Sequence, residues 1–204
     1  MKTKFALVFA ALFVCAAAAF AADAPPQMTP AQKAMMDKMM KAATPGPQHA
    51  MLAKMAGEWT CTVKFQTDPS QPWQESQSTA TISALMDGRY IQEISKGQMA
   101  GMPFNGMGVY GFDNVSGKYV STWIDNMGTG IMNSVGTADA SGKVITWTGT
   151  MNDPATGKPT KERMVTTILS DDHHTMEMFG TPPGAKKEMK TMTIDYVRQG
   201  TAAR

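Results

Sequence analysis

The residues best suited to chemistry lie in the segment His173-His174-Thr175-Met176-Glu177-Met178. In an extended strand, side chains alternate between two faces, so His174, Met176 and Met178 would share one face. Imidazole and thioether groups are ligands that suit copper, and this pattern predicts a copper site as an alternative function. The segment Asp171-Asp172-His173-His174 is also typical of a polar turn, in which case these side chains bind no metal.

Motifs for other chemistry are missing from the sequence. It contains no Gly-x-Ser-x-Gly nucleophile elbow, no His-Glu-x-x-His zinc motif and no Cys-x-x-Cys pair. The three histidines, His49, His173 and His174, form no recognisable Ser-His-Asp pattern. No nucleophile can be named, so the sequence predicts no catalytic residue and no cofactor, with copper as the alternative.

A second candidate site surrounds the Gly-rich segment 123–130. Alternation places Tyr119, Trp123 and Asp125 on one face of a predicted strand, beside the turn that follows it. A few polar groups among aromatic side chains are typical of small-molecule sites. The alternative is that Asp125 caps its turn and that Arg89 faces water. The six residues predicted to bind a small apolar or amphipathic molecule are Arg89, Tyr90, Tyr119, Trp123, Asp125 and Trp147.

Two helices are predicted before the strands. Residues 30–43 are rich in Ala, Met, Lys and Gln, which favour helices, and Thr29-Pro30 supplies a cap and a first-turn proline. Residues 48–56 predict a second, shorter helix. Methionines at helical spacing form one apolar stripe, which would add thioethers to the copper site, cover a barrel mouth, bind a partner, or merely rest on the barrel. They are Met35, Met36, Met39 and Met40.

From Gly57 the hydrophobic period changes from about 3.6 to 2 residues, which indicates strands. The first strand places Trp59 and Cys61 on its inner face. Roughly ten such patterns continue to Arg198, and their short connections require an antiparallel, up-and-down order. Closure removes exposed sheet edges. The predicted fold is therefore all-β, a barrel of roughly ten antiparallel strands after one or two short N-terminal helices. A two-sheet sandwich is the alternative.

Residues 1–21 have the pattern of a secretory signal peptide. Lys2 and Lys4 precede an apolar stretch of about 16 residues, which is shorter than the ~20 residues of a membrane-spanning helix. Ala19-Phe20-Ala21 supplies small residues for cleavage. Export to the periplasm of a Gram-negative bacterium is therefore predicted, without a stable membrane span. Cys15 leaves lipidation as an alternative.

The remaining chain divides into a leader with the Met-rich helix over residues 22–45, a barrel domain over 46–198 and a disordered tail over 199–204. Without Lys2 and Lys4 the 19 basic residues become 17, which equals the 17 acidic residues. This balance argues against nucleic acid or an anionic membrane as a partner. Cys61 is then the only cysteine, so an internal disulfide is excluded.

An ordered series of motifs in this sequence resembles the bacterial DUF1579 family, a domain of unknown function. The resemblance covers about residues 46–198 and implies an exported, small β-barrel of the lipocalin or calycin type. The motifs are Gly-Pro-Gln-His at 46–49, Gly57-Glu58-Trp59, Asp87-Gly88-Arg89-Tyr90, Gly111-Phe112-Asp113-Asn114, Tyr119-Val120-Ser121-Thr122-Trp123, Asp125-Asn126-Met127-Gly128-Thr129-Gly130 and Gly149-Thr150-Met151-Asn152-Asp153-Pro154.

The Gly-x-Trp motif at Trp59 is also similar to that of lipocalins, in which a tryptophan closes one end of the barrel beneath an arginine from the last strand. That resemblance implies a structural pair of Trp59 and Arg198, because a guanidinium stacks favourably on an indole. The alternative is that Trp59 is an ordinary core residue.

These observations favour an exported protein that binds a small apolar or amphipathic molecule in its barrel, since eight to ten strands can enclose a lumen. Two alternatives stay open. The first is a periplasmic copper-handling protein that uses His174, Met176 and Met178. The second is an envelope protein-interaction or stress module, whose helix or barrel rim binds another protein.

Overall fold

The computed structural model describes residues 28–66, 68, 70–152, 156–181 and 187–200 of the 204-residue chain. The predicted signal peptide 1–21 and the tail residues 201–204 lie outside the described residues. The chain divides into two compact units, residues 1–37 and 38–204. Two helices come first, α1 (Pro30–Ala43) and α2 (Pro47–Ala53). Thr29 caps α1, because its Oγ1 accepts a hydrogen bond from the Gln32 backbone N–H.

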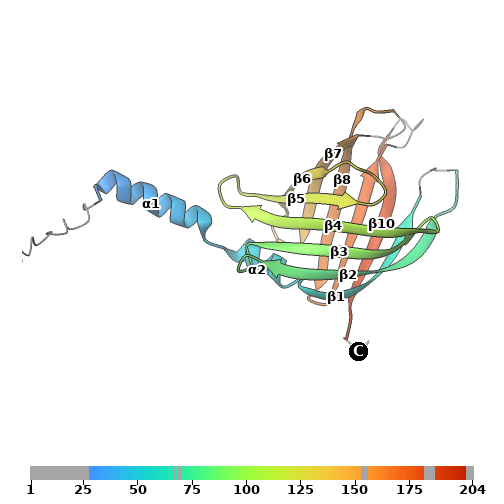
Figure 1. Ribbon diagram of the computed structural model, residues 1–204, viewed down its shortest axis with the longest axis horizontal. Helices are drawn as coiled ribbons and strands as arrows, with labels where there is room; N and C mark the ends of the chain where they lie inside the picture. The colour runs from blue at the N-terminus through green and yellow to red at the C-terminus, as the bar shows by residue number, and fades with distance from the viewer. Residues whose placement is uncertain (1–27, 67, 69, 153–155, 182–186, 201–204) are drawn as a thin grey trace, which may run out of the picture. The chain divides into compact units, whose positions relative to one another are not determined.

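Ten strands form one closed barrel in which every pairing is antiparallel (Figure 1). Each strand pairs with its neighbours in sequence, and the first strand closes the barrel on the last. This arrangement confirms the predicted up-and-down barrel and excludes the sandwich. The strands are β1 (Gly57–Phe65), β2 (Gln74–Leu85), β3 (Tyr90–Met99), β4 (Met102–Asp113), β5 (Lys118–Asp125), β6 (Met132–Ala138), β7 (Val144–Asn152), β8 (Pro159–Ser170), β9 (His173–Gly180) and β10 (Met189–Arg198).

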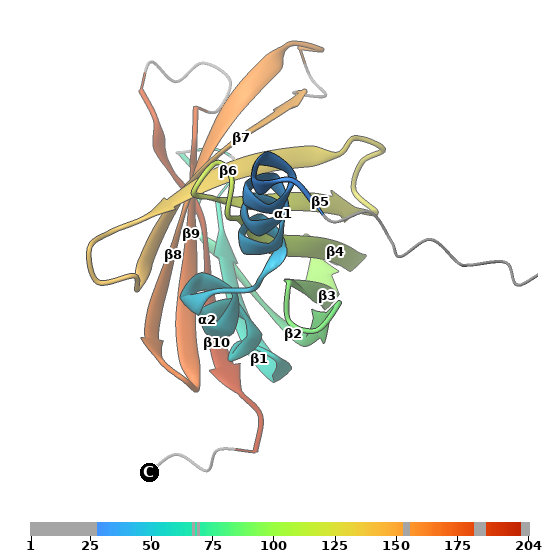
Figure 2. The same cartoon turned by 90° about the vertical axis from the view of Figure 1, so that its left-hand side faces the viewer.

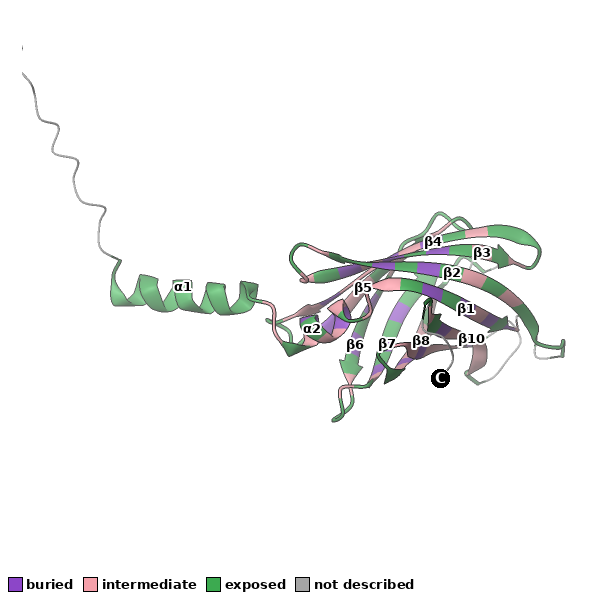
Figure 3. Ribbon diagram, turned by 90° about the horizontal axis from the view of Figure 1, so that it is seen from below, coloured by how far each residue is buried: buried purple, intermediate pink, exposed green. Residues whose placement is uncertain are grey.

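Alternate residues along the strands point into the barrel, as the bands of buried residues in Figure 3 show. Cys61, on β1, is buried and is the free thiol of this core. The core lies toward the end of the barrel where α2 connects to β1. Its buried members are Leu52, Trp59, Cys61, Ala80, Ile82, Ile91, Tyr119, Ile145, Trp147, Met164 and Tyr196.

The short helix α2 lies across this end of the barrel, which we call the α2 end (Figure 2). Leu52 of α2 is buried in the barrel core. The Gly-Pro-Gln-His motif starts the helix: Pro47 occupies its first turn, and Nδ1 of the buried His49 accepts a hydrogen bond from the Gly46 N–H at 3.0 Å. Asn114, in the β4–β5 turn, donates hydrogen bonds to the carbonyls of Ala42 and Thr44 and fixes the segment before α2. Both motifs thus position the helix.

The sequence predicts a turn over residues 97–103, but the connection in the structure is much shorter. Strands β3 and β4 continue until they meet at Ala100 and Gly101, both of which have positive φ angles of 50° and 78°. Glycine readily adopts such angles, so a two-residue turn suffices. Gly106 and Gly108 lie within β4, where the indole of Trp123 would contact any Cβ atom.

Candidate functional site

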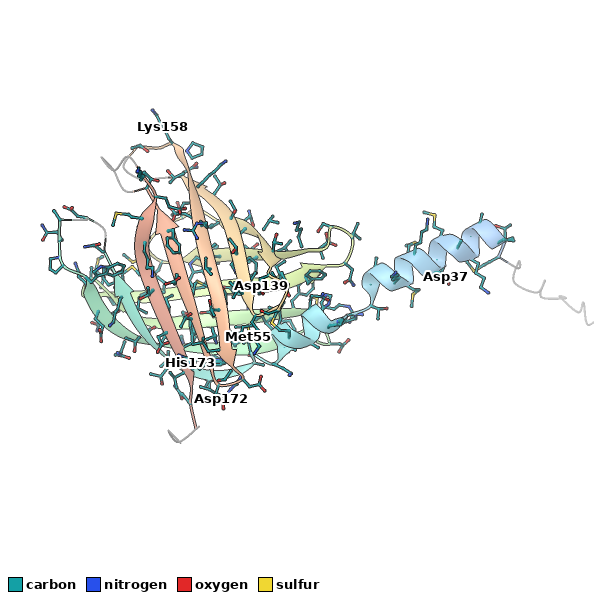
Figure 4. All side chains as sticks on the ribbon, turned by 180° about the vertical axis from the view of Figure 1, so that it is seen from behind. Asp37, Met55, Asp139, Lys158, Asp172 and His173 are labelled. Carbon is teal, nitrogen blue, oxygen red and sulfur yellow. The ribbon has the colours of Figure 1, made fainter. Side chains whose placement is uncertain are left out.

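A groove of about 780 Å³ opens at the α2 end of the barrel, between α2 and the turns that join the strands there. Figure 4 shows Met55 and Asp139 beside this helix and Lys158 at the opposite end of the strands. The groove lining combines apolar side chains, among them Met51 and Tyr119, with polar groups at its rim. Its volume lies within the range of 300–1,000 Å³ that is typical of small-molecule sites.

A second, much smaller cavity lies deeper, inside the barrel core. It has about 30 Å³, which is room for one water-sized group. Leu52 and Met55 border it on the helix side, and strand residues form its other walls. Met55 and His174 also border the outer groove. These two residues therefore belong to the walls of both spaces.

Glu93, which is 4% exposed, lines the inner cavity. Its Oε1 accepts hydrogen bonds from Ser95 Oγ at 2.8 Å and from the Tyr196 hydroxyl at 3.1 Å. Tyr110 also interacts with this carboxyl through its hydroxyl. Burial raises the pKa of Glu93, and the neighbouring hydroxyls offset part of this shift. Three neutral donors therefore surround one acid in the interior.

Gly108 allows Tyr110 to reach Glu93. The two β4 residues both face inward, and Gly108 is the β4 partner of Glu93 in the β3–β4 pairing. A Cβ atom at Gly108 would lie 2.9 Å from the hydroxyl oxygen of Tyr110 and 2.7 Å from its ring. Any larger residue would displace the tyrosine from the acid.

His174 is the second buried titratable group of the site, at 4% exposure. Its ring stacks on Tyr196 at 4.2 Å and meets the edge of Trp59 at 4.5 Å between centroids. Burial, followed by the nearby charges of His173 and Arg198, lowers the pKa of His174 to about 4. Its Nδ1 atom is buried, with no hydrogen-bond partner among the described residues. His174 is therefore a neutral aromatic wall of the site at physiological pH.

Arg198 holds Trp59 at the edge of the site. Its guanidinium carbon lies 4.3 Å from the centroid of the Trp59 ring. The same group donates to the carbonyls of Ala56 at 2.7 Å and Lys54 at 2.8 Å, while the Trp59 Nε1–H donates to the Met55 carbonyl at 2.9 Å. These contacts join the last strand to the connection between α2 and β1.

The glycine of the Gly-x-Trp motif has a steric role beside this pair. Gly57 has a φ angle of 145°, and a Cβ atom there would lie 2.2 Å from Nη1 of Arg198. Only glycine leaves room for the guanidinium. The observed pairing of Trp59 with Arg198 is the geometry that the lipocalin resemblance implied.

Two of the six residues predicted to bind a ligand line these cavities. Tyr119 borders the groove and Trp147 borders the inner cavity, and both are 3% exposed. Their rings meet edge to face at 5.9 Å. The Trp147 Nε1–H donates to Thr166 Oγ1 at 3.1 Å, which satisfies its polar atom within the core.

Trp123 and Asp125 face inward as well, but they lie near the opposite end of the barrel, away from the groove. The Trp123 Nε1–H donates to Asp125 Oδ2 at 2.8 Å, and Asp125 Oδ1 accepts from the Met127 N–H at 2.9 Å. Asp125 thus caps its turn, which was the alternative interpretation. The structure does not bring these two residues together with Tyr119 and Trp147.

The structure places Arg89 and Tyr90 outside the interior, and for Arg89 this is the alternative interpretation. Arg89 belongs to the β2–β3 turn, where it donates to the Met86 carbonyl at 3.1 Å and pairs with Asp87 at 3.7 Å. Tyr90 is 39% exposed and lies over Gly111. Because Ile91 points inward, alternation turns Tyr90 outward.

The three residues predicted to bind copper share the inward face of β9. His174 and Met176 border the inner cavity, and Met178 is the next inward residue along the strand. The polar turn is confined to Asp171 and Asp172, since His173 already begins β9. Among the described residues, no cluster of three or more His, Cys, Asp and Glu side chains is arranged to hold a metal ion.

Glu93, the most deeply buried acid of the site, was not predicted from the sequence. Its signal was present: Ile91, Glu93 and Ser95 alternate on one face of β3, so a carboxyl occurs where an apolar residue is expected. Its partner Tyr196 follows 103 residues later and reaches it only because the barrel closes.

None of the helices in the described part of the chain has the length and hydrophobicity of a membrane span. Two solved structures share the barrel fold at low sequence identity. The crystal structure of Rv2717c from M. tuberculosis is 15% identical, with a TM-score of 0.58 over 76% of this chain and 99% of that one. The S-type phycobiliprotein lyase CPES from Guillardia theta is 9% identical, with a TM-score of 0.52 over 80% of this chain and 98% of that one.

A search of curated proteins finds no match to this chain. The sequence profile of DUF1579, described as a protein of unknown function, matches residues 44–198. This range includes the whole barrel, α2, and all the residues that line the groove and the inner cavity. The chain therefore belongs to the DUF1579 family.

Proposed function

We propose that this protein is exported to the periplasm and binds a small apolar or amphipathic molecule at the α2 end of its barrel. One observation carries the proposal: the groove of about 780 Å³ shares two of its lining residues, Met55 and His174, with an inner cavity that Glu93 lines. A ligand in the groove would contact aromatic and methionine side chains. The inner cavity would add a small number of polar groups, as in known small-molecule sites.

A calorimetric titration with octan-1-ol tests this proposal. Ala50 is exposed on α2 and lines the groove, so the Ala50→Trp variant would fill part of the groove without changing the barrel core. We expect this variant to bind octan-1-ol at least about tenfold more weakly than wild type. The matched control is Val135→Trp, on the outer face of β6, which should bind like wild type. No binding by wild type, or equal binding by Ala50→Trp, would refute the proposed site.

Export is supported by the signal-like pattern of residues 1–21. The test is the N-terminal sequence of the protein recovered from the periplasm of a Gram-negative host. We expect a chain that begins after Ala21 or one residue later. A full-length chain retained in the cytoplasm would contradict this part of the proposal.

Copper binding is a second candidate function, favoured by one arrangement. His174 and Met176 border the same inner cavity, with Met178 next to them on the inward face of β9. Imidazole and thioether groups together suit Cu(I). A titration with Cu(I) against a competing chelator should then show binding that the double variant Met176→Leu and Met178→Leu weakens. Met127→Leu, at an exposed turn, is the control. Unchanged affinity in the double variant would exclude this candidate.

A further inference from the structure

The environment of Glu93 is unusual because it offers a buried acid only neutral partners. Its carboxyl group accepts hydrogen bonds from the hydroxyls of Ser95 and Tyr196, and the Tyr110 hydroxyl is a third donor. In the part of the chain that the structure describes, Glu93 forms no salt bridge, although six other pairs are present. Buried carboxylates are ordinarily paired with a cation or bound to a metal, because desolvation of an isolated charge is costly. Burial without a cation favours the neutral acid, whereas a cation that entered the cavity would stabilise the carboxylate.

The walls of the inner cavity suit a cation. Tyr110, Trp147 and Tyr196 line it together with Glu93, and aromatic rings attract a positive charge. The volume of about 30 Å³ is close to that of one water molecule, which is also about the size of an ammonium group. The lowered pKa of His174, about 4, leaves this neighbouring ring uncharged at neutral pH, so it does not repel a cation.

A ligand would reach this cavity from the groove. Met55 and His174 are the two residues common to both spaces. The thioether of Met55 is flexible and belongs to the turn that follows α2. A displacement of Met55 would join the two spaces into one site, with a mostly apolar outer part and an acid at its inner end.

We infer that the ligand carries a cationic amine, which enters the inner cavity and binds the carboxyl group of Glu93, while its apolar part occupies the groove. This inference rests on the proposed small-molecule site and adds the chemical class of its ligand. It makes Glu93 the residue that determines specificity. Anionic amphiphiles of the same length are excluded by repulsion from that acid.

Three probes of equal chain length test the inference: octylamine, octan-1-ol and octanoate, titrated by calorimetry into wild type and Glu93→Gln. A hydrogen-bonded charge pair should make octylamine bind wild type at least about tenfold more tightly than octan-1-ol, and octanoate should bind weakest. In Glu93→Gln the amine should lose this advantage, while octan-1-ol binds within about twofold of wild type. Circular dichroism checks that the variant is folded.

The outcomes separate this inference from the proposed function. If octan-1-ol and octylamine bind wild type equally, or if Glu93→Gln keeps the preference for the amine, the inference is wrong and the groove remains a binding site. If none of the three probes binds wild type, the proposed function itself fails. Should Glu93→Gln not fold, the order of the three affinities in wild type alone decides the matter.

Discussion

The two ends of this barrel use the same alternation of inward residues but differ in what covers them. At the α2 end, Trp59 and Trp147 are 1% and 3% exposed, and a helix closes the core above them. Toward the other end, Trp123 is only partly buried although it also faces inward. Its indole bonds to Asp125 rather than to a neighbouring element. The alternating pattern determines whether a side chain points inward, whereas α2 determines how far that side chain is buried.

This difference separates polar groups with different roles. Asp125 and Asn126 lie at the end of the barrel opposite α2, which we call the open end. Their side chains form hydrogen bonds with backbone groups of their own turn and of the adjacent β3–β4 hairpin. Glu93 and His174 at the α2 end are enclosed by aromatic rings and have shifted pKa values. Perturbed titratable groups beside a cavity are typical of functional sites. The α2 end is therefore the end that we assign to binding.

The largest difference between the ends should appear when each tryptophan is removed. Trp59→Ala should lower the free energy of unfolding by about 3–5 kcal/mol, because the indole is buried and lies beneath Arg198. Trp123→Ala removes a half-buried ring and should cost about 1–2 kcal/mol. Urea denaturation measures both values. Equal losses would show that the two ends are equally packed.

The role of α2 as a cover can be tested at Leu52. Leu52→Ala should lower the free energy of unfolding by about 3 kcal/mol, since it removes buried methyl groups above the inner cavity. Acrylamide should then quench the core tryptophans Trp59 and Trp147 more strongly than in wild type. Ala50→Gly, on the exposed side of the same helix, is the control for helix propensity. Unchanged quenching would contradict the cover.

The α2 end should also determine how stability depends on pH. The pKa of His174 falls from 6.5 to about 4 on folding, so between these values the unfolded chain binds a proton that the folded chain does not. Stability from this group is complete above pH 6.5 and is lost as the pH falls toward 4, by about 3 kcal/mol in total. His174→Phe should remove this loss in urea denaturation curves between pH 4 and 7. An identical pH slope in wild type and variant would disprove the assignment.

Glu93 acts in the opposite direction. Its pKa is raised on folding, so the folded protein takes up a proton before the unfolded chain as the pH falls. The group therefore offsets part of the loss that His174 causes. Glu93→Gln should make the loss of stability on acidification steeper than in wild type, in the same denaturation series. A shallower slope would mean that the pKa of Glu93 is not raised.

The smallest expected effect is at the open end. Asn126→Ala removes a hydrogen bond from its side chain to the Pro103 carbonyl and one from the Asn105 N–H, both at 2.8 Å. Both are exposed to solvent, so the free energy of unfolding should fall by only about 1 kcal/mol, with no change in probe binding. Thr129→Ala in the same connection is the control and should have no effect. Altered probe binding in Asn126→Ala would extend the site to this end.

Alternation was enough to predict the barrel and the inward faces, because a period of two residues fixes which side chains point the same way. It predicted that His174, Met176 and Met178 share one face of their strand, and it predicted the faces on which Tyr119 and Trp147 lie. The orientation of Arg89 and Tyr90 was not predictable in this way, since it depends on where the turn ends and the strand begins.

The composition of the site was harder to predict than the fold. The contact of Glu93 with Tyr196 joins residues 103 positions apart, and it requires the register of a closed barrel. The two cavities exist because α2 lies across one end, and no local pattern in residues 47–53 shows which end of the barrel they cover. Helix α2 is held in this position by hydrogen bonds from Arg198 to the carbonyls of Lys54 and Ala56. Arg198 lies near the other end of the chain.

The most direct test of the central claim, that ligands bind at the α2 end, uses the methionines of the chain as reporters. Methyl-labelled methionine resonances would be followed by NMR during a titration with octan-1-ol. We predict that Met51, Met55 and Met176, which line the groove or the inner cavity, change their chemical shifts. Met102, Met127 and Met151, which are exposed toward the other end, should stay unchanged. Shifts confined to this second group, or none at saturation, would contradict the account.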